Sequence, residues 1–153
     1  MGGQLPSTGA GKPTFLVAAR QDPGTLDHPG TPLQRLQIIK GWITENGQHR
    51  ERVINVAGDA YSEATVDIRS CETRGEGFAQ LCTVLTDEDF KPGEQAYYYS
   101  RVVENPSCRW STFQCNALPE AERPASCSDP DVPKTIQERA WTSPIWYTSP
   151  ATK

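Results

Sequence analysis

The sequence has few hydrophobic residues and no long run of them. Only 36% of its 153 residues are hydrophobic, whereas globular domains usually contain about 45–50%. No stretch approaches the roughly 18 consecutive apolar residues of a transmembrane helix, so no segment is predicted to span a bilayer. The opening residues Met-Gly-Gly-Gln-Leu-Pro also lack the basic and apolar regions of a secretory signal, so we expect no signal peptide in this chain.

Histidine is scarce, and positive charge is not in excess. The chain has two histidines, and its 15 basic residues are outnumbered by 19 acidic ones, for a net charge of −4. This balance argues against nucleic acid and anionic membranes as partners, because both bind basic surfaces. His28 and His49 lie in turn-like sequence, and no Gly-x-Ser-x-Gly motif is present. We therefore expect no catalytic residue, metal ligand or cofactor site in this chain.

The five cysteines do not have the spacing of a zinc site, which needs Cys-x2–4-Cys pairs or histidine partners. Disulfides suit a chain with so few hydrophobic residues, and they indicate an oxidising compartment. We predict that Cys71–Cys82 closes a Gly-rich loop and that Cys115–Cys127 closes a Pro-rich loop, which leaves Cys108 free. Five reduced thiols in a cytoplasmic protein are the alternative.

Thirteen prolines and twelve glycines predict many turns and few long helices. Asn46-Gly47 is a strong hairpin signal, because both residues tolerate positive φ. Arg109–Phe113 is predicted to be a short strand continuation. Thr135–Trp141 could form one or two helical turns or a strand, and a short helix is favoured. Seven segments have the alternation or the β-branched and aromatic content of strands: Phe15–Ala19, Leu36–Ile43, Arg50–Val56, Ala64–Ile68, Leu81–Leu85, Ala96–Val103 and Pro144–Tyr147.

About seven antiparallel strands around one core predict an all-β sandwich with long Pro-rich loops, and an open barrel is the alternative. The sandwich is expected to span residues 14–148. Residues 1–13 are rich in Gly, Pro, Ser and Thr and are predicted to form a flexible arm or linker. Residues 149–153 are predicted to form a tail.

Two motifs could bind ligands. The carboxylates of Asp87, Glu88, Asp89 and Glu94 could gather around calcium, but the glycine that a calcium loop needs comes late in the segment, so a solvated turn is favoured. Gly75-x-Gly77 lacks the remaining residues of a phosphate-binding loop and is predicted to be a flexible loop.

The aromatic residues allow two interpretations. Aromatic faces can form a platform for sugar rings, but core and interface packing is the more usual use of such side chains, and we favour it here. The residues concerned are Trp42, Trp110, Trp141, Trp146, Tyr97, Tyr98, Tyr99 and Tyr147.

Three motifs in the same order resemble a known bacterial family. They are Pro32–Trp42, Ala96–Ser111 and Gln137–Tyr147. Together they are similar to the carboxyl-terminal part of the family called domain of unknown function 3604. The resemblance spans roughly residues 13–148 and implies a relationship to the PHP (polymerase and histidinol phosphatase) metal-dependent hydrolases.

The resemblance implies an immunoglobulin-like sandwich at the end of a longer, exported enzyme whose metal site lies upstream of this region. Two histidines cannot supply that multinuclear site, so no catalytic residue carries over. The chain is therefore expected to be a non-catalytic accessory domain that packs against an N-terminal PHP-like catalytic domain of the same polypeptide, in the periplasm or outside the cell. An aromatic-lined module for a carbohydrate or other ligand is the alternative. Arg20, Asp22, Trp110 and Trp146 are the candidate interdomain or ligand-binding residues.

Overall fold

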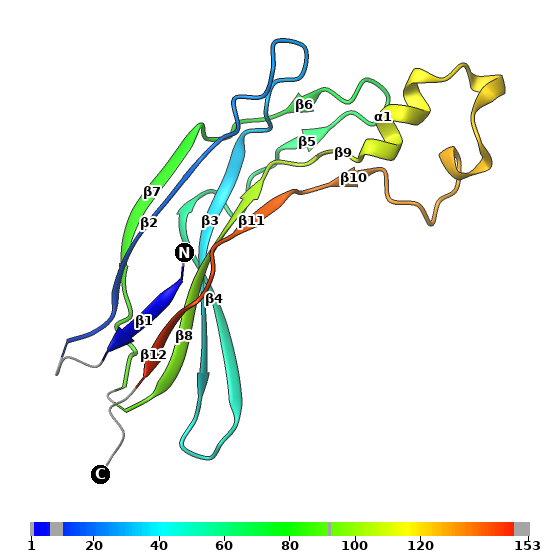
Figure 1. The fold of residues 1–153 in the computed structure, drawn as a ribbon. Coiled ribbons are helices and arrows are strands. Elements are labelled where there is room, and N and C mark those ends of the chain that lie inside the picture. The colour runs from blue at the N-terminus through cyan, green and yellow to red at the C-terminus, as the bar shows by residue number, and fades with distance from the viewer. Residues whose placement is uncertain (1, 7–10, 92, 149–153) are drawn as a thin grey trace.

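The computed structural model describes residues 2–6, 11–91 and 93–148 and contains one large sheet (Figure 1). The long strand β8 (Gln95–Glu104) pairs along one edge with β3 (Leu33–Ile43) and along the other with both β11 (Arg139–Trp141) and β12 (Ile145–Thr148). All these pairs are antiparallel, whereas β1 (Gly3–Pro6) adds to β12 in parallel. In spatial order the sheet contains β1, β12, β8, β3 and β4 (His49–Gly58), with β11 beside β12 on β8.

A second, two-stranded layer covers one face of the large sheet. It consists of β2 (Thr14–Arg20) and β7 (Gln80–Thr86), which pair antiparallel along their whole length. Alternate residues of these strands point inward, as the period of two requires. Phe15 of β2 lies against Tyr98 of β8, with ring centroids 4.6 Å apart. The core between the layers is formed by Phe15, Ile38, Phe90, Ala96, Tyr98 and Tyr147 in one cluster and by Leu33, Leu36 and Leu81 in another. The predicted all-β sandwich is therefore confirmed.

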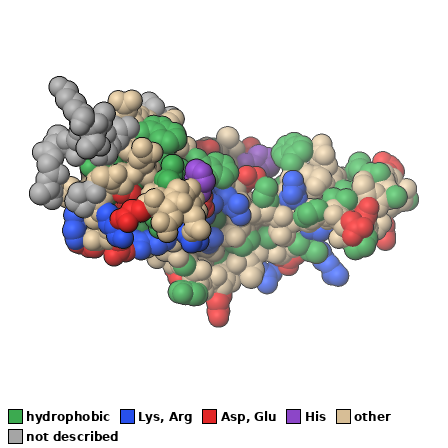
Figure 2. All heavy atoms as spheres, turned by 90° about the horizontal axis from the view of Figure 1, so that it is seen from below, with side chains coloured by type: hydrophobic (Ala, Val, Ile, Leu, Met, Phe, Trp, Pro, Cys, Tyr) green, Lys and Arg blue, Asp and Glu red, His purple; other side chains and the backbone are tan. Residues whose placement is uncertain are grey.

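An extension projects from one end of the sandwich, opposite the end that holds the β3–β4 turn (Figure 1). Viewed from below, the molecule tapers toward this extension, and basic and acidic side chains are interspersed over the wider end (Figure 2). The extension contains the short pairs β5 (Thr65–Val66) with β6 (Thr73–Arg74) and β9 (Ser107–Cys108) with β10 (Thr135–Ile136), the helix α1 (Trp110–Ala117), and the 3-10 turns η1 (Glu120–Glu122) and η2 (Ala125–Cys127). No helix among the described residues is long and apolar enough to cross a membrane.

Several local predictions need correction. Arg109–Phe113 does not continue a strand, because α1 begins at Trp110. Thr135–Trp141 is not the favoured short helix: its ends take the alternative strand conformation as β10 and β11, which pair with β9 and β8. Within the predicted arm, Gly3–Pro6 form β1. Residues 7–10 of the arm and the predicted tail, residues 149–153, lie outside the described residues.

The structure contains two disulfides. Cys115 pairs with Cys127, as the sequence predicts. Cys71 pairs with Cys108 and not with Cys82, so the predicted Cys71–Cys82 bond is wrong. The two cysteines lie in different parts of the molecule. Cys82 lies opposite Ala18 on the exposed face of β7, whereas Cys71 lies in the turn between β5 and β6, and β5 packs beside β9, which contains Cys108. Cys82 is therefore the free thiol, in place of Cys108.

Candidate functional site

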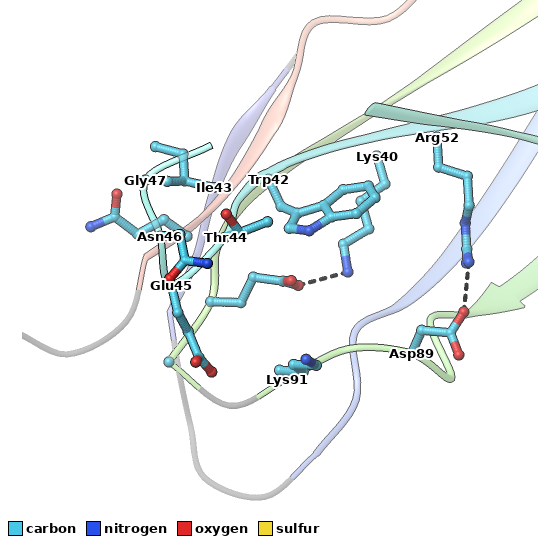
Figure 3. A pocket seen from close by; sticks show the side chains of 13 residues that line it. Lys40, Trp42, Ile43, Thr44, Glu45, Asn46, Gly47, Arg52, Asp89 and Lys91 are labelled. Atoms are coloured by element: carbon cyan, nitrogen blue, oxygen red, sulfur yellow. Dashed lines mark hydrogen bonds and ion pairs between the residues drawn. The ribbon is translucent and has the colours of Figure 1, made fainter. Parts of the chain in front are cut away.

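A hollow of about 780 Å³ opens at the end of the sandwich where β3 turns into β4 (Figure 3). Lys40 and Trp42 line it from β3, and Arg52 lines it from β4. The opposite wall is formed by residues between β7 and the start of β8, namely Asp89, Lys91, Gly93, Glu94 and Gln95.

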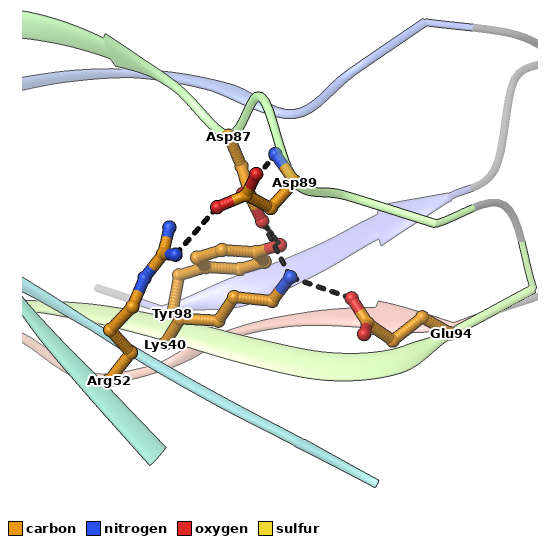
Figure 4. Close-up of polar contacts among 6 residues, drawn as sticks. All are labelled: Lys40, Arg52, Asp87, Asp89, Glu94 and Tyr98. Carbon is orange, nitrogen blue, oxygen red and sulfur yellow. Dashed lines mark hydrogen bonds and ion pairs between the residues drawn. The ribbon is translucent and has the colours of Figure 1, made fainter. Parts of the chain in front are cut away.

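Lys40 lies at the base of the hollow and is almost completely buried. Its ammonium nitrogen is 2.7 Å from Asp87 Oδ2 and 2.6 Å from Glu94 Oε2 (Figure 4). The same nitrogen lies 5.1 Å from the centroid of the Trp42 ring, within the range of a cation–π contact. Tyr98 donates a hydrogen bond to Asp87 Oδ2 at 2.7 Å. The cation therefore links β3 to Asp87, which follows β7, and to Glu94, which precedes β8.

These contacts change the acidity of two groups. Burial by itself would raise the pKa of Asp87, but the hydrogen bonds from Lys40 and Tyr98 outweigh it and hold that pKa below its usual value. Burial, followed by the hydrogen bond to Asp87, raises the pKa of Tyr98. Both shifts keep Asp87 charged and Tyr98 protonated as its donor.

The acidic segment is only in part the solvated turn that the sequence favours: Glu88 and Asp89 are mostly exposed, whereas Asp87 and Glu94 are buried. Each of its carboxylates is paired with a side-chain cation: Asp87 and Glu94 with Lys40, Glu88 with Lys12, and Asp89 with Arg52 at 2.6 Å. In the part of the chain that the structure describes, no three His, Cys, Asp or Glu residues group in a way that could hold a metal ion.

A second surface lies on the face of the large sheet that points away from β2 and β7, which we call the front face. Along β8, Tyr97, Tyr99, Arg101 and Val103 point to this face, because Tyr98 between them points into the core. No described helix or strand is stacked on it (Figure 1). The cross-strand partners of these β8 residues point to the same face. They are Gly41, Ile39, Gln37 and Arg35 on β3, Arg139 and Trp141 on β11, and Trp146 on β12.

Three aromatic rings of the front face, Tyr97, Tyr99 and Trp146, form what we call the aromatic platform. A Cβ at Gly41 would lie 2.2 Å from Tyr97 Cζ, so the Tyr97 ring lies over this glycine of β3. The Tyr99 ring is parallel to it within 10°, with centroids 6.3 Å apart. The Trp146 ring lies 5.2 Å from Tyr97 and is half exposed. Ile39 beside Tyr99 is fully covered although no described strand or helix overlies it.

Three arginines continue the front face beyond the platform, and we call them the arginine row. Arg35 and Arg139 flank Val103 from the two neighbouring strands, and Arg101 is the next front-face residue along β8. Burial and then the charges of Arg101 and Arg139 lower the pKa of Arg35. None of the three forms an ion pair with a carboxylate among the described residues.

The candidate residues predicted from sequence do not come together. Arg20 lies at the end of β2, Asp22 accepts a hydrogen bond from the Gly24 amide in the following loop, and Trp110 begins α1 in the extension. Trp146 lies on β12, toward the other end of the molecule (Figure 1). Trp146 therefore belongs to the aromatic platform, whereas Arg20, Asp22 and Trp110 do not.

The sequence interpretation missed Lys40 and the arginine row. A lysine within the otherwise apolar run Ile38–Ile43 is a signal that could have found the buried cation. The sequence favours core packing over a ligand platform for the aromatic residues, but the tyrosines divide between the two. Tyr98 and Tyr147 are buried in the core, whereas Tyr97 and Tyr99 are on the front face.

The comparisons with known proteins give one match. A family model described as a protein of unknown function, DUF3604, matches residues 1–149. No curated protein and no solved structure matches the chain.

Proposed function

The chain belongs to the DUF3604 family, described only as proteins of unknown function, and from this premise we propose that it is a non-catalytic accessory domain of a larger, PHP-like metal-dependent hydrolase. Its partner is the N-terminal catalytic domain of the same polypeptide. In this proposal the sandwich packs against the catalytic domain and supports it, and the substrate chemistry takes place there.

The observation that supports this proposal is an apolar patch on the outer face of the two-stranded layer. Leu16 on β2 and Val84 on β7 are cross-strand partners, and they are 73% and 62% exposed. The next pair on this face, Ala18 and Cys82, is also small and apolar. Contiguous exposed apolar groups of this kind are typical of surfaces that pack against another domain. Arg20 follows on the same face of β2 and would lie at the border of the contact.

The two disulfides support an oxidising location for the parent enzyme. We place it in the periplasm or outside the cell.

The test uses the full-length parent enzyme. We expect β2 and β7 to exchange amide hydrogens more slowly there than in the isolated chain, and Leu16→Ser with Val84→Ser to lower the melting temperature of the catalytic domain. Leu26→Ser is the matched control, because Leu26 is fully exposed in a loop away from this patch. Equal exchange of β2 and β7 in both proteins would contradict the proposed packing.

A second candidate function is a module that binds a ring-bearing ligand such as a carbohydrate. The specific observation in its favour is the aromatic platform, whose Tyr97 and Tyr99 rings are parallel within 10°. Parallel aromatic faces fixed on a sheet suit the flat faces of sugar rings. Trp146→Ala should weaken binding of an oligosaccharide, and Trp110→Ala, at an even more exposed tryptophan in the extension, should not.

A further inference from the structure

We propose that the front face binds an acidic polysaccharide, with the sugar rings on the aromatic platform and their carboxylate or sulfate groups on the arginine row. This inference rests on the second candidate function and adds the chemical class of the ligand.

The platform and the arginine row form one continuous surface. Tyr97, Tyr99, Arg101 and Val103 are successive front-face positions of a single strand, and Arg35 and Arg139 lie on either side of Val103. The strand rises by roughly 20 Å between Tyr97 and Val103. A chain of several sugar units can lie along such a distance and contact rings at one end and cations at the other.

Arg101 is held in place by neutral partners. Its Nε donates to Gln37 Oε1 at 2.8 Å, and Gln37 Nε2 donates to Asn55 Oδ1 at 2.7 Å. Both contacts come from strands of the same sheet, so the guanidinium is positioned without an acidic partner. Its terminal amino groups make no ion pair with a carboxylate among the described residues, and a planar guanidinium fits carboxylate or sulfate oxygens in a bidentate manner.

The charges of the arginine row favour an anion. Arg35 has two other arginines near enough to lower its pKa and no carboxylate among the neighbours that shift it. Like charges gathered in this way repel one another, whereas the loop around Lys40 pairs each of its carboxylates with a cation. An anion on the arginine row would remove that repulsion.

A polysaccharide fits better than a single-stranded nucleic acid. Nucleic acid binding depends on many contacts between basic side chains and phosphates, and this face offers three arginines on a chain with a net charge of −4. Acidic polysaccharides combine rings for the platform with fewer, spaced anionic groups.

The experiment measures binding of the isolated chain to three polymers by affinity electrophoresis and calorimetry: a polyuronate, a sulfated galactan and a neutral galactan. We expect binding to at least one acidic polymer that weakens with salt and is roughly tenfold weaker for Arg101→Gln with Arg139→Gln, as the loss of charge-assisted hydrogen bonds predicts. Trp146→Ala should also weaken it. Arg69→Gln with Arg109→Gln is the matched control, because both arginines are exposed in the extension. Carboxylate and sulfate ligands are distinguished by which acidic polymer binds.

Arg101→Lys with Arg139→Lys keeps the charge and guards against a folding defect, and melting temperatures are compared for all variants. Equal binding of the neutral galactan, unaffected by the arginine variants, would overturn the acidic ligand but leave the ring-binding module standing. No binding to any polymer would reject both. Tighter binding of an oligothymidylate with the same dependence on Arg101 would overturn the assignment to a polysaccharide.

Discussion

At the scale of single residues, the buried cation Lys40 is the feature that most distinguishes this core. It is 3% exposed and lies between Asp87 and Glu94. Removing one member of a buried ion pair leaves the others charged and unpaired, which typically costs about 3–5 kcal/mol. We therefore expect Lys40→Met to lower the free energy of unfolding by about that amount in urea titrations.

The matched control for Lys40→Met is Lys12→Met, which breaks an exposed pair with Glu88. Exposed pairs contribute about 0–1 kcal/mol. If both substitutions cost the same, the buried cluster would not stabilise the fold in the way its geometry indicates.

The lowered pKa of Asp87 makes stability depend on pH. An unfolded aspartate titrates near pH 3.9 or so, and the folded pKa of Asp87 is lower, so its contribution is fully present above that range and is lost as the pH falls through the folded pKa. We expect the unfolding free energy of the wild type to decrease below about pH 5. Asp87→Asn should be less stable at neutral pH and should have a flatter curve in this acidic range. Parallel curves for the two proteins would contradict the assignment.

At the scale of elements, the β3–β4 hairpin has glycines with positive φ at both ends of β4. Gly47 in the tight turn has φ +73°, and a Cβ added there would meet nothing within 4 Å. Gly58 has φ +82°, and its Cβ would lie 2.3 Å from the Gln34 carbonyl oxygen. Gly47→Ala should cost about 1 kcal/mol for its backbone conformation alone. Gly58→Ala should cost clearly more in thermal unfolding, because it adds a collision with β3. Equal costs would show that β4 can move away from Gln34.

The strands that are predicted best from sequence are those whose own residues carry a strand or turn pattern. Alternating apolar residues and Asn46-Gly47 predict β3, the turn and β4, and the run at 96–103 predicts β8. Prediction fails where a distant strand decides the conformation. Thr135–Trp141 has no strong pattern of its own, and its two halves become strands only because β9 and β8 offer free edges. The same applies to Cys71, whose partner depends on how β5 lies beside β9.

The aromatic platform and the arginine row of the front face are predictable from sequence to different degrees. Alternation along Tyr97-Tyr98-Tyr99 predicts that the outer two tyrosines share a face, but not whether that face is the core. The arginine row brings together Arg35, Arg101 and Arg139, which are far apart in sequence and meet only through the register of three strands. No local pattern contains that register.

At the scale of the whole molecule, the sandwich and the extension are stabilised by different means. The sandwich has two clusters of buried hydrophobic residues. In the extension, α1 buries only Thr112, and η1 and η2 bury no residue. The extension therefore depends on its covalent links, Cys115–Cys127 with a sequence separation of 12 and Cys71–Cys108 with a separation of 37.

These links should act locally and in order of loop length. Loop-closure entropy gives about 3 kcal/mol for the shorter link and about 4 kcal/mol for the longer one. We expect Cys115→Ser with Cys127→Ser to speed amide hydrogen exchange in residues 110–127 while β3 and β8 keep their protection, and Cys71→Ser with Cys108→Ser to extend the fast exchange to β5, β6 and β9. Cys82→Ser should change neither region, because Cys82 is an exposed free thiol. Loss of protection in β3 and β8 on breaking either link would mean that the extension and the sandwich unfold as one unit, and that burial between the layers is not sufficient to hold the sheet on its own.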